Sequence, residues 1–123
     1  MRGEGAPDAV TVDALLDELA ALGYLSDARF AHAVVTRQTG RYSRRAIAGA
    51  LKAKGVAADT VAEALTAAEG DDASALIAIW QRRFGEPPRD EREKARQVRF
   101  LQSRGFSLSA IFKLLRSPPD RND

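Results

Sequence analysis

The sequence predicts an all-α protein built from tandem three-helix repeats, helix-turn-helix-like units stacked in an elongated, curved array. Three observations lead to this prediction. Apolar residues recur at helical spacing in seven short segments, and the good helix formers alanine, leucine and arginine dominate the composition. Serine or aspartate precedes several of these segments, and glycine follows them. Finally, a motif that begins at Leu51 recurs at Leu101.

Each of the seven segments has one apolar face. The segments run over about residues 11–22, 26–38, 43–54, 57–69, 72–84, 90–104 and 107–116. In the same order, the faces are Leu15, Leu19 and Leu22; Phe30, Ala33 and Val34; Ile47, Ala50 and Leu51; Val61, Ala64, Leu65 and Ala68; Leu76, Ile77, Trp80 and Phe84; Ala95, Val98 and Leu101; and Leu108, Ile111, Phe112 and Leu115. Residues three or four apart share one side of a helix, so each segment is predicted to bury that side.

Start and stop signals support these boundaries. The candidate N-caps are Ser26, Ser43, Asp71 or Asp72, and Ser107; the candidate stops are Gly23, Gly55, Gly85, Gly105 and the pair Pro118–Pro119. A capping side chain accepts a hydrogen bond from a free first-turn amide, and glycine tolerates the left-handed conformation that ends many helices. The fourth segment lacks such a cap, because Ala57 stands where Ser107 precedes the matching segment.

A repeat underlies the helices. Leu51-Lys-Ala-Lys-Gly55-Val56 matches Leu101-Gln-Ser-Arg-Gly105-Phe106 at an offset of 50 residues, and Asp27-Ala28 matches Asp72-Ala73 at 45. Units of this size that stack on one another form elongated arrays. The predicted organisation is a disordered N-terminus (1–10), the third helix of an incomplete first repeat (11–25), a second repeat (26–70), a third repeat (71–116) and a disordered tail (117–123). The alternative is a single seven-helix bundle.

Composition excludes several function classes. The chain has no cysteine and a single histidine, His32, which leaves no thiolate chemistry, no disulfide and no histidine pair for a metal. The acidic pair Asp71–Asp72 is explained by helix capping rather than by a metal. No apolar run is long enough to span a membrane, and Met1 to Val10 has no apolar signal core. We therefore expect a cytoplasmic, non-enzymatic protein without a cofactor, and we predict that it is a monomer.

The net charge of +2 hides a block pattern. Residues 28–58 hold seven basic residues and no acid, and residues 94–116 hold six and no acid. Of the 19 basic residues, 15 are arginine, whose planar guanidinium suits phosphate and carboxylate. Such blocks are typical of proteins that bind a polyanion or an acidic protein surface, although a basic run can also be a solvated helix face.

The candidate contact residues lie in the third and sixth segments. Arg41, Arg45 and Lys52 fall near one line with Arg44 beside it, and Arg89, Arg92, Arg96 and Arg99 form a second stripe at helical spacing. The residues that we predict to bind a partner or DNA are Arg41, Arg44, Arg45, Lys52, Arg96, Arg99 and Arg104. Tyr42 could stack on a base or cover the core, whereas Trp80 is predicted to lie in the core.

The motifs carry a family resemblance. The run Leu22-Gly23-Tyr24-Leu25-Ser26-Asp27-Ala28-Arg29-Phe30-Ala31 resembles the signature of the RecX family of recombinase regulators. Three later stretches are similar to that family and occur in the same order. They are Gly40-Arg41, then Ile47 with Leu51 to Val56, and finally the closing stretch Arg99 to Ser107 with Ile111. The resemblance covers about residues 11–116. The sequence departs from the family pattern in lacking the first two helices before Thr11 and in carrying Gly49 mid-helix and Ala57 without a cap.

The resemblance implies a function. Family members are tandem three-helix-repeat proteins that bind the RecA recombinase filament on single-stranded DNA and restrain its ATPase and strand exchange, as modulators in DNA repair and the SOS response. The same is expected here, with the RecA filament and its single-stranded DNA as partners. The alternative is an independent helix-turn-helix DNA-binding protein formed by segments 43–54 and 57–69. The latter segment begins Ala57-Ala58-Asp59-Thr60 and carries no basic residue, which is unfavourable for a recognition helix.

Overall fold

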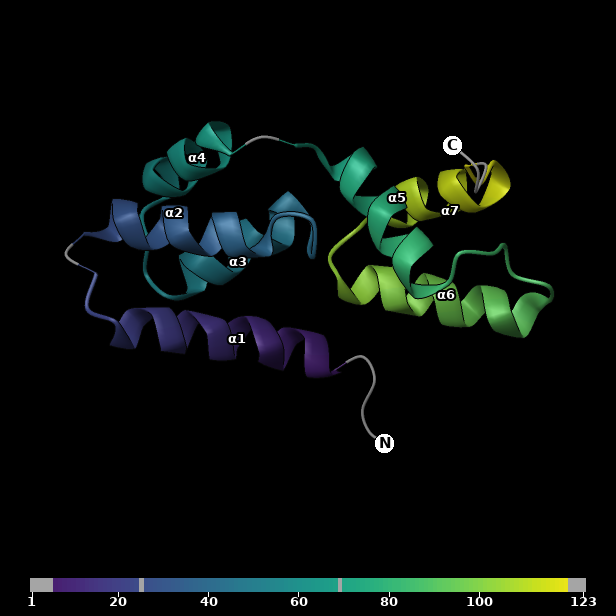
Figure 1. Ribbon diagram of the computed structural model, residues 1–123, viewed down its shortest axis with the longest axis horizontal. Coiled ribbons are helices and arrows are strands. Elements are labelled where there is room, and N and C mark those ends of the chain that lie inside the picture. Colours follow the sequence, from purple (N-terminus) through teal and green to yellow (C-terminus); the bar gives the residue numbers. More distant parts are fainter. Residues whose placement is uncertain (1–5, 25, 69, 120–123) are drawn as a thin grey trace.

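The computed structural model describes residues 6–24, 26–68 and 70–119, and their side chains from Ala14 onward. These residues form helices joined by short turns, with no strand beyond an isolated bridge between Thr39 and Tyr42 (Figure 1). The helices are α1 (Ala6–Ala21), α2 (Asp27–Gln38), α3 (Arg44–Ala53), α4 (Ala58–Ala67), α5 (Asp72–Arg83), α6 (Glu91–Ser103) and α7 (Leu108–Arg116). The prediction of an all-α fold is confirmed, and every helix after α1 begins and ends within two residues of its predicted bounds.

Helix α1 differs most from the prediction. It begins at Ala6, so residues 6–10, which were predicted to be disordered, form its first turns. Pro7 is compatible with this start, because the amide that proline lacks has no helical partner in a first turn. The helix ends at Ala21, and Leu16 rather than Leu22 is buried with Leu19; Leu22 is 69% exposed. The disorder predicted for residues 1–5 and 120–123 lies outside the described residues.

The predicted caps form, with one addition. The side chains of Ser26, Ser43, Asp71 and Ser107 each accept a hydrogen bond from a backbone N–H in the first turn of the next helix. Asp90, which was not predicted as a cap, does the same for α6. At Asp71 the backbone N–H of Ser74 donates to the carboxylate, which lowers the pKa of that carboxyl below its ordinary value. Ala57 makes no side-chain cap.

Two separate apolar cores hold the helices. The first gathers α1 to α4 around residues such as Leu16, Val34 and Ile47, and the second gathers α5 to α7 around residues such as Trp80 and Ile111. Figure 1 shows the two groups of helices side by side along the longest axis of the molecule, with α1 beneath α2 and α3. Helices α1–α4, the first unit, and α5–α7, the second unit, each bury a core of their own, which confirms the tandem-repeat prediction against the alternative of one bundle.

The second core contains a buried polar pair. The Trp80 indole N–H donates to Oε1 of Gln97 at 2.9 Å, and Nε2 of Gln97 donates to the Glu86 carbonyl at 3.1 Å. Trp80 and Gln97 are almost inaccessible to solvent. Because both the indole and the amide are satisfied, the tryptophan can fill the core without leaving a polar atom unpaired. The core position predicted for Trp80 is confirmed.

The repeat is visible in the backbone. The N–H of Val56 bonds to the Leu51 carbonyl and that of Phe106 to the Leu101 carbonyl, at 3.1 and 3.3 Å. The glycine before each, Gly55 and Gly105, has φ of +96°. A left-handed glycine that closes a helix in this way lets the next helix turn back at once, so α3–α4 and α6–α7 are equivalent hairpins.

The two units meet where α3 begins and α6 ends. The backbone N–H of Ser43 donates to the Arg104 carbonyl at 2.9 Å, and that of Arg44 donates to Oδ1 of Asp72, also at 2.9 Å. A β-carbon on Gly105 would lie 2.6 Å from Cβ of Ala46, closer than real contacts allow. The junction therefore combines hydrogen bonds from the backbone of Ser43 and Arg44 with a close approach that only glycine permits.

The first prediction concerns Gly49, which lies in the middle of α3. It is exposed, and a β-carbon there would meet nothing within 4 Å. Alanine at this position should raise the free energy of unfolding by about 1 kcal/mol, because glycine is the poorer helix former by that amount. Urea unfolding followed by circular dichroism would measure the gain. An unchanged or lower stability would contradict the open surroundings of Gly49.

Candidate functional site

The basic stripe predicted on α3 is at the surface. Arg45 and Lys52 are exposed on the helix, while Ile47 and Leu51 on its opposite side are buried in the first core. Arg41 is exposed in the turn that precedes α3. Because the apolar residues fix the orientation of the helix, the charged side chains are presented to solvent in a defined order along it.

Arg44, the fourth predicted residue of this stripe, is placed differently. It is half-buried, and its guanidinium Nη2 donates to the carbonyl of Leu65 in the last turn of α4. That carbonyl belongs to the negative end of the α4 dipole, so a cation there stabilises the helix end. Its backbone N–H is bound by Asp72. The structure thus uses Arg44 within the fold, which sequence periodicity could not distinguish from the exposed role of Arg45.

The second stripe lies on α6. Arg96 and Arg99 are exposed there, and the Arg96 guanidinium lies 5.9 Å from the centre of the Phe84 ring. Arg89, at the start of the stripe, forms an ion pair with Glu93, with Nη2 and Oε2 3.2 Å apart. The Arg89 backbone N–H also donates to this carboxylate, and both contacts hold the pKa of Glu93 below its ordinary value. Arg89 is therefore neutralised locally, whereas Arg96 and Arg99 make no ion pair with a described acid.

Arg104 joins the two units. It is half-buried, and Nη1 donates to the Arg41 carbonyl at 2.9 Å. Its guanidinium lies 4.9 Å from the ring centres of both Tyr42 and Phe100, one from each unit. Tyr42 is only 5% exposed, so it covers the core and does not present a free ring to a base. Arg104, which follows α6, thus contacts Arg41, the first residue of the predicted α3 stripe.

Two arginines near this junction were not among the predicted site residues. Arg82 lies beside Gly40, with Nη2 3.4 Å from the Gly40 carbonyl. Arg83 stacks on Phe100, with its guanidinium 4.4 Å from the ring centre. The repeat contained the signal for Arg82, because the offset of 45 residues makes it the equivalent of Arg37, within the long basic block.

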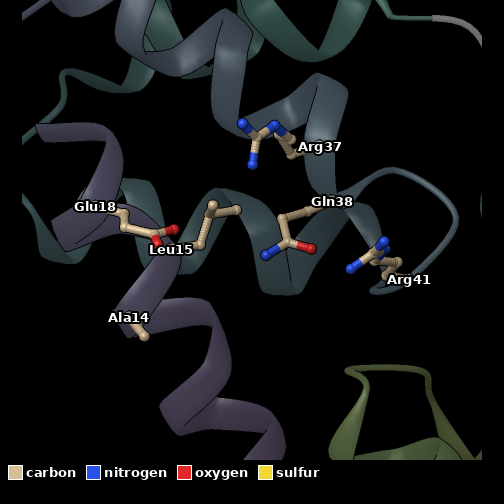
Figure 2. A pocket seen from close by; sticks show the side chains of 6 residues that line it. All are labelled: Ala14, Leu15, Glu18, Arg37, Gln38 and Arg41. Atoms are coloured by element: carbon tan, nitrogen blue, oxygen red, sulfur yellow. The ribbon is translucent and has the colours of Figure 1, made fainter. Parts of the chain in front are cut away.

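Two surface hollows flank Arg41. The first, of about 360 Å³, is lined by Ala14, Leu15 and Glu18 of α1 and by Arg37, Gln38 and Arg41 (Figure 2). Figure 2 shows Glu18 on α1, with Leu15 and Gln38 between it and Arg41, and with Arg37 above Gln38. The second lies at the junction and is lined by Thr39, Gly40, Arg41, Arg82 and Arg104. The first is lined by an acid and two bases, and the described lining of the second includes three bases.

Two further kinds of feature were sought in the described part of the chain. Its histidine, aspartate and glutamate residues form no group of three that could hold a metal ion. No helix in residues 6–24, 26–68 or 70–119 combines the length and apolar character needed to cross a membrane.

Comparisons with known proteins identify relatives over nearly the whole chain. Family models of the second and third three-helix domains of RecX match residues 26–65 and 70–115. A Regulatory protein RecX from Leptothrix cholodnii is 42% identical over 118 residues, which is 96% of this chain and 75% of that protein. Proteins of the same name from Ralstonia pickettii and Ralstonia nicotianae are 38% and 37% identical over 89% and 94% of this chain and 69% and 74% of their own lengths. No solved structure matches the chain.

Proposed function

The chain belongs to the RecX family of regulatory proteins, and from this premise we propose that it binds the RecA recombinase filament on single-stranded DNA. It acts there as a monomeric regulator, not as an enzyme, and restrains the ATPase and strand exchange of the filament in the cytoplasm. Through the filament it moderates DNA repair and the SOS response. The observation that supports this most is the set of exposed basic residues on α3 and α6, together with the contact between Arg41 and Arg104 at the junction.

The charge of this surface is complementary to the groups that a recombinase filament exposes. A recombinase filament on DNA carries phosphates and acidic side chains, and clustered guanidinium groups bind both. Phosphate contacts position a protein without reading sequence, which suits a regulator that must act on any DNA. The alternative of an independent helix-turn-helix reader is less well supported. The α4 helix carries no basic residue, and its last turn is bound by Arg44.

The second prediction tests the exposed part of the α3 stripe. Arg45→Glu combined with Lys52→Glu should raise the concentration needed for half-inhibition of RecA ATPase on single-stranded DNA by roughly 10-fold, because two attractive charges become repulsive. The helical circular dichroism signal should be unchanged, since both side chains are exposed on their helix. Arg44 is left intact in this variant because it is used within the fold.

A matched control separates a specific contact from a general loss of positive charge. Arg29→Glu with Lys113→Glu makes the same charge change at two exposed positions on α2 and α7, and it should change half-inhibition by less than about 3-fold. If the folded parent protein leaves the ATPase unaffected at substoichiometric amounts, the proposed function is wrong. If both double variants weaken inhibition equally, the α3 stripe is not a specific contact surface.

A further inference from the structure

The hollow at the junction of the two units is lined by several arginines. Its volume is about 460 Å³, and it is lined by Thr39, Gly40 and Arg41 from the turn before α3 and by Arg82 and Arg104 from the second unit. None of these lining residues is acidic. Three arginines from three different segments therefore line one hollow.

Backbone carbonyls hold this arrangement. The Gly40 carbonyl lies 3.4 Å from Nη2 of Arg82, and the next carbonyl, that of Arg41, accepts from Nη1 of Arg104 at 2.9 Å. Gly40 has φ of +87°, a conformation that favours glycine and that allows the turn before α3 to run in this way. Two arginines of one unit are thus directed onto a single turn of the other.

We propose that this hollow binds a backbone phosphate of single-stranded DNA, with Arg82 as a contact residue beside Arg41 and Arg104. Three arginines that line one hollow from different segments match a tetrahedral oxyanion, whose oxygens accept from several sides. A single carboxylate pairs with one planar fork and would leave the others unmatched. The charge gathered in the hollow therefore fits a phosphate better than an acidic side chain of a protein partner.

The position of the hollow adds a consequence. Because its lining comes from both units, a bound phosphate contacts both and stabilises the docked arrangement over any arrangement in which they separate. Single-stranded DNA should therefore raise the melting temperature of the protein. The inference rests on the proposed function only in its choice of single-stranded DNA as the source of phosphate, and it is tested without recombinase.

The test compares two arginines that differ in place but not in charge. Arg82→Gln should weaken binding of a short fluorescein-labelled oligo(dT), measured by fluorescence anisotropy, by about 5-fold at low salt, and should lower the slope of log affinity against log salt by about one. It should also abolish most of the DNA-induced rise in melting temperature. The control is Arg29→Gln, because Arg29 is exposed near the start of α2, roughly 15 Å along that helix from Thr39. It should change affinity by less than about 2-fold.

Competitors identify the source of the phosphate. Pyrophosphate and ATP are expected to displace oligo(dT) only weakly, because neither extends beyond the hollow. The proposal is wrong if Arg82→Gln and Arg29→Gln weaken DNA binding equally, or if either small competitor binds more tightly than oligo(dT) in a way that depends on Arg82. It is also wrong if Arg82→Gln leaves DNA binding intact but weakens inhibition of the recombinase, since the hollow would then receive an acidic protein group. If the parent protein does not inhibit the recombinase but DNA binding still depends on Arg82, only the proposed function is overturned.

Discussion

Replacing Gly105 with alanine should lower the free energy of unfolding by about 3 kcal/mol or more. Two effects add at this residue. Its φ of +96° is unfavourable for any residue with a β-carbon. In addition, the new β-carbon would lie against the side chain of Ser43 and 2.6 Å from Cβ of Ala46, both on the other unit. Ser43 cannot move aside freely, because its hydroxyl caps α3 and its backbone N–H is bound to the Arg104 carbonyl.

The repeat supplies a control for this change. Gly55 occupies the equivalent turn with the same φ of +96°, but a β-carbon there would meet nothing within 4 Å. Gly55→Ala should therefore lower stability by only about 1–2 kcal/mol, the contribution of the backbone conformation. Urea unfolding of both variants would measure the difference, which reports the close approach of the two units. Equal losses would contradict the packing of Gly105 against α3.

Undocking of the units would also be visible in function. The junction hollow is lined by residues of both units, so Gly105→Ala should weaken oligo(dT) binding more than Gly55→Ala does, even where both variants remain helical. A larger loss of binding in Gly105→Ala than in Gly55→Ala would show that the junction hollow depends on glycine at position 105.

Most of the predicted helix boundaries depended on signals from residues close together in the sequence. Helix ends could be located from caps and glycines, because these depend on neighbours within a few residues. Asp71 and Asp72 show where this stops. Both were expected to act at the start of their helix, but only Asp71 caps α5, whereas Asp72 binds the backbone N–H of Arg44 in the other unit. Which of two adjacent carboxylates reaches across a junction depends on the docking of the units, and no local pattern encodes that.

In the candidate site, too, some features could be predicted from local sequence and others depend on tertiary packing. Periodicity separates the charged side of α3 from its buried side, and the exposure of Arg45 and Lys52 follows from it. Whether a residue at the edge of that side meets solvent or another helix is a tertiary question, and Arg44 meets α4. Arg82 could have been identified from the repeat, as the equivalent of Arg37. That it lies beside Gly40 could not, because 42 residues separate them along the chain.

Arg44→Glu should lower the free energy of unfolding by about 2–3 kcal/mol. The variant loses the guanidinium that donates to the Leu65 carbonyl, and it places a carboxylate at the negative end of the α4 dipole. The new carboxylate would also lie near Asp72, which is bound to the backbone of the same residue. A glutamate in the first turn of α3 gains a favourable interaction with the dipole of α3, but this is about 0.5 kcal/mol and offsets only part of the loss.

The neighbouring residue provides the matched comparison. Arg45→Glu makes the same charge change in the same first turn of α3, with the same gain from the α3 dipole, but its side chain is exposed. Its stability should therefore stay within about 0.5 kcal/mol of the parent. Thermal and urea unfolding of the two variants would separate them, and equal stability would show that the guanidinium of Arg44 is not needed by the fold. Because Arg44→Glu acts through folding, reduced inhibition of the recombinase by that variant would not identify a contact. The same reduction in the stable Arg45→Glu would identify one, since only the surface has changed.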